Sequence, residues 1–266
     1  MERVALKVAY DGSAFYGFQR QPGLRTVEGE ILRALTRVGI IEDAKSANFR
    51  GASRTDRGVS ALGNVVAFDT ERPELTLPRI LNHHLRDVWV VGRAVVPPEF
   101  NPRYASRGKT YRYYVAGEVD MAALRECASL FVGRHDFSNF ARLEKHKNPV
   151  RTIKSIEVLQ EGPVTVLEFR GESFLWEMVR RITTALLLCS RGELSTGEVR
   201  AMLNREVEKK LPPAPPENLV LWEVELPGVT FEMGSEAREK IERDFFERYA
   251  RAAVRAALFS DFLRAF

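Results

Sequence analysis

The chain has 266 residues, of which 45% are hydrophobic and 29% charged, with 18 Gly, 13 Pro and 2 Cys. This composition is typical of a globular protein with one or two domains, and it excludes a collagen, a disordered tail or a disulfide scaffold. No apolar stretch approaches the roughly 18 residues that cross a bilayer, and the N-terminus does not have the pattern of a signal peptide. We therefore expect a cytoplasmic protein.

The net charge of +4 is unevenly distributed along the chain. Residues 1–112 contain 18 Lys and Arg against 12 Asp and Glu, residues 113–227 contain 15 against 17, and residues 228–266 contain 7 of each. Part of the basic excess is grouped, as Arg50, Arg54 and Arg57 and as Arg103, Arg107, Lys109 and Arg112. Such groups can neutralise the phosphates of a polyanion, although a solvated Arg-rich surface explains the charge equally well.

The first part of the chain is predicted to alternate strands and helices. Apolar residues at every second position indicate a strand over residues 3–10. Thr26 is placed to cap a helix over residues 27–38, whose apolar residues recur at helical spacing. The full order expected here is strand 3–10, helix 27–38, strands 47–53 and 64–70, helix 77–85 and strand 88–96.

The second part repeats this mixture and adds a hairpin. The expected order is strand 110–115, helix 121–131, hairpin strands 153–159 and 164–170, a helix from Phe174 to about Gly192, a helix from Ser195 or Thr196, and strand 219–226. Because strands and helices mix without strict alternation, we predict an α+β fold with a largely antiparallel sheet. Residues 234–266 are expected to be helical, with an apolar stripe that packs either on the body or on a second subunit.

Motifs for metals and common cofactors are absent from the sequence. The four histidines have no Cys or carboxylate partner at a metal-ligand spacing, and no phosphate-binding glycine loop is present. A nucleophile elbow and the zinc deaminase pattern are also missing. We therefore expect no cofactor and no metal, and we interpret His83, His84, His135 and His146 as surface or packing residues.

The segment Gly51–Ala61 places an acidic residue among arginines. Asp56 follows a predicted strand, so a rigid element presents it in a loop, and Arg54 and Arg57 flank it. Cations that close are expected to lower the pKa of the carboxyl group and hold it ionised. An ionised aspartate can serve as a nucleophile or an electrostatic anchor. The alternative is a turn with a surface salt bridge.

Tyrosines and cations alternate in the next basic segment. On a strand, Tyr111 and Tyr113 share one face while Arg112 and Tyr114 share the other. Aromatic side chains beside cations suit stacking on an unpaired base next to a phosphate, although a Tyr-rich core strand would show the same pattern. Further along the chain, Arg180 or Arg181 follows apolar positions of a predicted helix, and either could face a cleft.

Taken together, these segments resemble the tRNA pseudouridine synthase A family. The resemblance covers about residues 3–227, and the tail lies outside it. The motifs that carry it are, in chain order, Tyr10-Asp11-Gly12-Ser13, Gly17-Phe18-Gln19-Arg20-Gln21, Arg54-Thr55-Asp56-x-Gly58-Val59, Lys109-Thr110-Tyr111-Arg112-Tyr113, Asp136-Phe137-Ser138-Asn139-Phe140 and Phe174-x-x-x-Met178-Val179-Arg180.

The resemblance implies a fold and a set of partners. It implies two RRM-like α/β lobes, residues 1–104 and 105–227, whose largely antiparallel sheets join across a basic catalytic cleft, with a helical extension over residues 228–266. It also implies a homodimer that binds one tRNA across both subunits. The substrates would be uridines at positions 38 to 40 of the anticodon stem-loop, and the product pseudouridine.

The resemblance also implies roles for individual residues. Asp56 would attack a flipped-out uridine, at either C1′ or C6, and Arg180 would keep it ionised and aimed. Tyr111 would stack on the uracil, and its hydroxyl could help to remove the C5 proton. Arg54 would insert near the vacated stack or hold the RNA backbone. The other RNA contacts implied are Arg20, Arg57, Arg103, Arg107, Lys109 and Arg112.

Two other functions are compatible with these patterns. A non-catalytic RNA-binding protein with two RRM-like lobes would explain the basic groups and the tyrosines, but it gives Asp56 no purpose and lacks the usual aromatic motif of that class. A pseudouridine synthase that acts on another RNA is the second alternative. Mapping of pseudouridine on tRNA treated with the protein separates all three.

Overall fold

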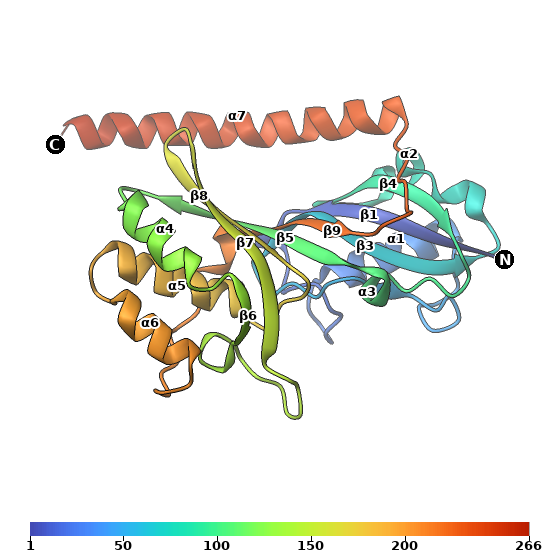
Figure 1. The fold of residues 1–266 in the computed structure, drawn as a ribbon. Helices are drawn as coiled ribbons and strands as arrows, with labels where there is room; N and C mark the ends of the chain where they lie inside the picture. Colours follow the sequence, from blue (N-terminus) through green and yellow to red (C-terminus); the bar gives the residue numbers. More distant parts are fainter. Residues whose placement is uncertain (266) are drawn as a thin grey trace.

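A computed structural model describes residues 1–265, which form one nine-stranded sheet with helices on both sides (Figure 1). The strand order across the sheet is β4-β1-β3-β9-β5-β8-β7-β6, and the short β2 pairs with β3. The strands are β1 (Glu2–Tyr10), β2 (Arg50–Gly51), β3 (Ser60–Thr70), β4 (Val88–Val96), β5 (Gly108–Ala116), β6 (Gly133–Asp136), β7 (Val150–Glu161), β8 (Val164–Gly171) and β9 (Leu219–Glu225).

Seven α-helices and four short 3-10 helices complete the described chain. The α-helices are α1 (Val27–Val38), α2 (Pro78–His84), α3 (Pro102–Ala105), α4 (Met121–Ser129), α5 (Met178–Ser190), α6 (Thr196–Leu203) and α7 (Ser235–Ala265). The 3-10 helices are η1 (Gly12–Ala14), η2 (Pro73–Thr76), η3 (Ser138–Phe140) and η4 (Pro216–Asn218).

The mixed α/β fold with a mostly antiparallel sheet is confirmed. The exception is the pairing of β3 with β9, which is parallel and short, with Ser60 opposite Val220 and Ala61 opposite Leu221. This pairing joins the strands β1 to β4 to the strands β5 to β8, so both groups belong to one continuous sheet. It lies directly after the loop that carries Asp56.

The apolar side chains gather in two main cores. The first core lies between α1 and the strands β1, β3 and β4, and the second lies between β5, β7, β8 and the helices α4 to α6. Strand β9 contributes to both, since Leu221 belongs to the first core and Leu219 to the second. Tyr111 packs against both cores, which places it at their junction.

Two expected elements differ from the structure. The strand predicted over residues 47–53 is reduced to Arg50–Gly51, because Asn48 has a φ of 44° and the chain leaves the sheet again at Ala52. The helix expected from Phe174 begins only at Met178. Its N-cap residue Glu177 has a φ of 60°, a left-handed conformation that a right-handed helix cannot include. The sequence did not predict β6 or α3.

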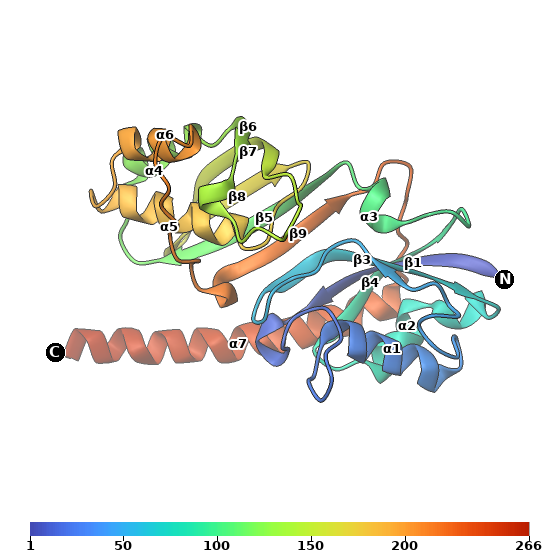
Figure 2. The same ribbon diagram turned by 90° about the horizontal axis from the view of Figure 1, so that it is seen from below.

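The C-terminal helix α7 packs on the body only at its beginning. Ala237 and Ile241 are buried, and Phe245 lies edge-on to Trp89 at 4.8 Å between ring centroids. Arg248, three residues further along, pairs with Asp11 and Asp87. Beyond it the helix extends along the side of the sheet opposite α4, α5 and α6, and its side chains are mostly exposed (Figures 1 and 2). None of the helices formed by residues 1–265 has the length and apolarity needed to cross a membrane.

Candidate active site

The turn that follows β1 packs closely against the loop that carries Asp56. A Cβ at Gly12 would lie 2.3 Å from the backbone of Val59, so only glycine allows the turn to approach this closely. The Gly12 amide donates to the Ser60 hydroxyl at 3.0 Å, and the Phe18 amide donates to the Thr55 carbonyl at 3.0 Å. These contacts explain why the sequence motif around Gly12 accompanies the motif around Asp56.

Buried side chains fix the same loop from within. The Tyr10 hydroxyl lies 2.9 Å from the Thr55 hydroxyl, and Asn64 donates to both the Tyr10 hydroxyl and the Ser53 carbonyl, at 3.2 and 3.1 Å. Tyr10, Asn64, Ser53 and Thr55 are all at most 9% exposed. The backbone on the N-terminal side of Asp56 is therefore held by side chains of β1 and β3, which gives the carboxyl group a defined position.

Arg180 reaches Asp56 from the second half of the sheet. It lies in the first turn of α5, and its Nη1 donates to Asp56 Oδ2 at 3.1 Å. Its Nε donates to the Ala214 carbonyl at 2.6 Å, so the guanidinium is held from two sides. The neighbouring Arg181 binds Glu177 and the Leu211 carbonyl instead. Of the two arginines that the sequence left open, the structure brings Arg180 to Asp56.

The expectation that flanking arginines lower the pKa of Asp56 was wrong. Burial has the largest effect and raises the pKa above its usual value, while the nearby Arg180 opposes this rise. The Glu177 carboxylate adds to the rise and the Trp176 side chain acts against it. Arg54 and Arg57 are exposed and form no ion pair with Asp56 in the described chain, because the rigid loop turns their side chains outward.

Tyr111 lies on β5 beside this pair. Its ring is edge-on to Phe174 at 5.1 Å between centroids. Burial raises the pKa of Tyr111 to about 12, the Ser53 side chain lowers it, and the charge of Asp56 raises it further. The phenol is therefore protonated at neutral pH and lies close to both Ser53 and Asp56.

Lys109 precedes Tyr111 on the same face of β5 and binds the Asp56 loop directly. Its Nζ donates to the Ala52 carbonyl at 3.0 Å. Burial, together with the nearby Arg103, lowers the pKa of Lys109 to about 8 from 10.5. The side chain expected to contact RNA thus also joins the loop to β5.

The lowered pKa of Lys109 makes stability depend on pH. Between about pH 8 and 10.5 the folded chain binds fewer protons at Lys109 than the unfolded chain does, so this residue makes the free energy of unfolding rise with pH. We expect the stability of the wild type relative to Lys109→Met, measured by chemical denaturation, to increase from pH 8 to 10. A difference that stays flat over this range would contradict the burial of the Lys109 ammonium.

The remaining predicted contacts fall into two groups. Arg20, Arg54, Arg57, Arg103 and Arg107 are exposed, and Arg57 lies over the Tyr16 ring at 4.4 Å. Arg112 does not join them, because it points to the opposite face of β5 from Tyr111. There it pairs with Glu168 at 2.7 Å and lies over the Trp222 ring at 3.9 Å.

The structure adds basic residues that sequence reasoning missed. The pKa of Lys147 is lowered by burial and then by the positive charges of Arg103, Arg151 and Arg54, so Lys147 lies within the field of all three arginines. They come from three distant parts of the sequence. The run of basic residues between Lys145 and Arg151 was the only signal, and it matched no motif.

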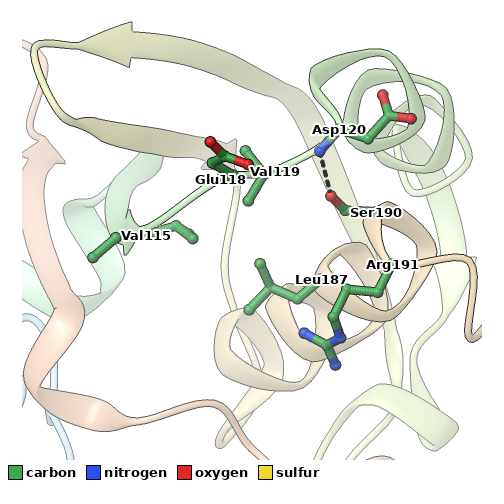
Figure 3. A pocket seen from close by; sticks show the side chains of 8 residues that line it. Val115, Glu118, Val119, Asp120, Leu187, Ser190 and Arg191 are labelled. Carbon is green, nitrogen blue, oxygen red and sulfur yellow. Dashed lines mark hydrogen bonds between the residues drawn. The ribbon is translucent and has the colours of Figure 1, made fainter. Parts of the chain in front are cut away.

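A surface pocket lies away from this site (Figure 3). It is lined at the far ends of β5 and α5, where the Asp120 amide donates to the Ser190 hydroxyl at 2.8 Å. Its lining residues are Val115, Ala116, Glu118, Val119, Asp120, Leu187, Ser190 and Arg191. None of the predicted site residues is among them. Within residues 1–265, no group of three or more His, Cys, Asp or Glu is placed to hold a metal ion.

This geometry pairs a partly buried carboxylate with a guanidinium beside a protonated phenol, at the junction of two cores. Such a carboxylate can act as a nucleophile. Residues 127–227, which include Arg180, match the family model described as tRNA pseudouridine synthase. The class of protein to which the site and this match point is a pseudouridine synthase.

Relatives that align with nearly the whole chain show the family to which it belongs. The chain is 59% identical over 262 residues to a tRNA pseudouridine synthase A of Thermococcus sibiricus, and 59% identical over 263 residues to one of Thermococcus kodakarensis; each alignment covers 98% of both chains. The chain belongs to the tRNA pseudouridine synthase A family, which confirms the resemblance of its motifs. A solved chain titled "Crystal Structure of a Cbf5-Nop10-Gar1 Complex" is 15% identical with a TM-score of 0.36, and the alignment covers 68% of this chain and 44% of that one.

Proposed function

We propose that this chain converts uridine to pseudouridine at positions 38 to 40 in the anticodon stem-loop of tRNA, with Asp56 as the attacking group. As a member of its family the chain is an isomerase. The observation that carries the proposed mechanism is the pair of Asp56 and Arg180 at 3.1 Å beside Tyr111. The reaction breaks the bond between N1 and C1′ and joins C5 to C1′, so it needs no external group and no net change of oxidation state.

The target uridine must leave its stack before Asp56 can reach it. Flipping a base out costs a few kcal/mol, which contacts to phosphates and a group that fills the gap can offset. Arg54 is exposed and lies two residues from Asp56, so it is suited to fill the gap or hold the backbone. Asp56 then attacks C1′, with uracil leaving as an anion, or C6 of the ring. In either case C5 joins C1′, the bond to Asp56 breaks and releases the carboxylate, and the proton lost from C5 is balanced by one gained at N1. Tyr111 stacks on the uracil and assists loss of the C5 proton.

The direct test is to map pseudouridine on unmodified tRNA after incubation with the protein. New pseudouridine at positions 38 to 40 supports the proposal. Binding of tRNA without any new pseudouridine would point to the non-catalytic RNA-binding alternative. Pseudouridine in another RNA, with none at these positions of tRNA, would point to a different target. Each result therefore selects one of the three functions.

The cations Arg54, Arg103 and Arg151, together with Lys147 within their field, support a contact with the tRNA backbone. If Arg103 neutralises a phosphate, Arg103→Gln should weaken tRNA binding at low salt and reduce the slope of log K against log salt by about 1. Binding titrations at several salt concentrations measure both quantities. Arg191→Gln, in an exposed arginine away from this group, is the control and should leave the slope unchanged. An unchanged slope for Arg103→Gln would remove it from the interface.

The exposed part of α7 supports the proposal of a homodimer. Val254, Phe259 and Leu263 are 69%, 53% and 83% exposed, although apolar patches of this kind are usually covered in soluble proteins. We expect the double variant Phe259→Ser with Phe262→Ser to shift a dimer to the monomer in analytical ultracentrifugation. A wild type that is already monomeric at micromolar concentration would contradict the dimer.

The proposed domains are residues 1–104, 105–227 and 228–266. The two main apolar cores and the exposure of most of α7 support this division. In this arrangement Asp56 belongs to the first domain while Tyr111 and Arg180 belong to the second. The basic catalytic cleft would then lie where these three residues meet, and the two domains would each have an RRM-like form.

A further inference from the structure

The segment before α5 carries an exposed tryptophan between two residues that contact the candidate active site. Phe174 lies edge-on to Tyr111 at 5.1 Å between ring centroids. Six residues later, the Arg180 Nη1 donates to Asp56 Oδ2 at 3.1 Å. Trp176 lies between these two residues in the sequence, and 43% of its surface is exposed. The proposed mechanism gives this large aromatic side chain no role.

The residues on either side of Trp176 hold it at the surface. Leu175 and Met178 are buried in the second core, and the Met178 amide donates to the Leu175 carbonyl at 3.1 Å. Glu177 has a φ of 60°, so the chain turns sharply before α5 begins. The Trp176 carbonyl accepts a hydrogen bond from the Arg142 amide at 2.9 Å. An anchored backbone therefore presents the indole ring outward.

Arg142 places a cation on this ring. Its guanidinium carbon lies 4.1 Å from the centroid of the Trp176 ring. Arg142 is exposed, and it directly follows Phe140 and Ala141, which are buried in the second core. Both members of the pair therefore extend from backbone that is fixed before any ligand binds, so little ordering is needed when one does.

The acidic residues next to this pair are bound to other cations. Glu144 pairs with Lys147, and Glu177 pairs with Arg181. The positive charge of Arg142 is therefore not taken up by the carboxylate two residues away or by the one next to Trp176. A cation left in this state attracts an anionic ligand such as a phosphate.

An aromatic ring beside a guanidinium has the chemistry that binds an unpaired nucleobase. Bases stack on tryptophan and on arginine planes, and the charge contributes to binding of the adjoining backbone. A uridine that flips out leaves its neighbours without a stacking partner on one side. Although burial raises the pKa of Asp56, the Trp176 side chain lowers it, which agrees with an indole beside this carboxylate. A base next to the flipped uridine is therefore the ligand that fits.

We propose that Trp176 and Arg142 form a stacking platform that binds the base next to the flipped uridine. The proposal rests on the proposed function, because it assumes that the target uridine enters the site beside Asp56. The platform acts by positioning: it binds a neighbour of the target and so keeps the flipped uridine between Asp56 and Tyr111. It makes no contact with the reacting atoms.

The first test removes the two partners of the stack separately and together. We would measure binding of wild type and Trp176→Ala to intact tRNA and to tRNA with one abasic nucleotide directly 5′ or 3′ of the target uridine. Trp176→Ala should bind intact tRNA about tenfold more weakly, within the range for one stacked base. At one of the two positions, the abasic tRNA should lose a similar factor with wild type and nothing further with Trp176→Ala, because both changes delete the same contact.

Losses that multiply at both abasic positions would overturn the proposal, and so would unchanged binding of intact tRNA by Trp176→Ala. Trp176→Phe keeps a smaller ring and should bind with intermediate affinity. The chain offers a matched control in Trp222, which lies under Arg112 at 3.9 Å on the face of β5 opposite Tyr111. Trp222→Phe should bind both RNAs as the wild type does.

Fluorescence gives a readout that a purely structural role of Trp176 would not change. The three tryptophans of the chain are Trp89, Trp176 and Trp222. Because a base stacked on an indole quenches its emission, saturating tRNA should quench the emission of wild type and of Trp222→Phe by the same amount. Trp176→Phe should lose this quenching even at tRNA concentrations that saturate it. Equal quenching in all three proteins would rule out the platform.

Failure of this inference can be told apart from failure of the proposed function. If the wild-type chain makes no pseudouridine at positions 38 to 40, the proposed function is wrong. If the wild type is active at these positions but Trp176→Ala binds intact and abasic tRNA as the wild type does, only the platform is wrong.

Discussion

Replacing Asp56 with asparagine is expected to reduce pseudouridine formation by about 10⁴-fold or more, because an amide cannot form the covalent bond that the proposed mechanism requires. The side chain keeps its size, and Arg180 can still donate to the amide oxygen, so the loop should keep its conformation. Binding of tRNA should stay within several-fold of the wild type. Single-turnover rates and equilibrium binding measure the two effects separately.

Asp43→Asn is the matched control for this variant. Asp43 is an aspartate of the first half of the chain that bonds to Ser46 and Lys45 in an exposed turn, away from Tyr111 and Arg180. Its replacement should leave the rate of pseudouridine formation unchanged. If Asp56→Asn turned over at a rate near that of the wild type, Asp56 would not be the attacking group and the mechanism would be wrong.

Replacing Arg180 with glutamine is expected to slow the reaction by about 10² to 10³-fold, the range found when one preorganised hydrogen-bond donor is removed from an active site. Two effects act together. Arg180 opposes the rise of the Asp56 pKa that burial causes, so without it more of the carboxyl group is protonated at a given pH. The variant also loses the bond from Arg180 to the Ala214 carbonyl, which aims the guanidinium.

The pH profile distinguishes these two effects. Loss of the positive charge raises the Asp56 pKa further, so the acidic limb of the rate profile should move to higher pH. Arg180→Lys keeps the positive charge but cannot bond to Asp56 and the Ala214 carbonyl at the same time. We expect its acidic limb to return part of the way to the wild-type position while its rate stays low. Arg191→Lys, at the other end of α5, is the control. A profile of Arg180→Gln that coincides with the wild type would show that the guanidinium does not act on Asp56.

Local patterns in the sequence were sufficient for most elements of the fold. Alternation located β1, and the cap at Thr26 located the start of α1, because these signals depend on neighbours in the chain. The strand expected over residues 47–53 was largely wrong. Only Arg50 and Gly51 pair with β3, while Ala47 and Ala52 on either side are buried in loop segments that each make one backbone hydrogen bond to β3. Burial in a loop and burial in a strand produce the same apolar pattern.

In the candidate site, too, local motifs predicted some features and only tertiary contacts decided others. The chemical character of Asp56 and Tyr111 could be inferred from motifs, since each motif lies within a few consecutive residues. Motifs could not show that Arg180 rather than Arg181 binds Asp56. That choice depends on tertiary contacts, because Arg181 binds Glu177 and the Leu211 carbonyl instead. The pairing of Arg112 with Glu168 likewise depends on the register of β5 against β8.

The sequence by itself determined the family, the mixed fold and the residues proposed for the site, because motifs and periodicity are properties of adjacent positions. Only the tertiary structure decided that burial raises the pKa of Asp56, that Lys147 lies near Arg54 and Arg103, and that Arg180 rather than Arg181 pairs with Asp56. Burial and the field of a charge depend on distances between residues far apart in the chain, and the sheet and its packing fix these distances.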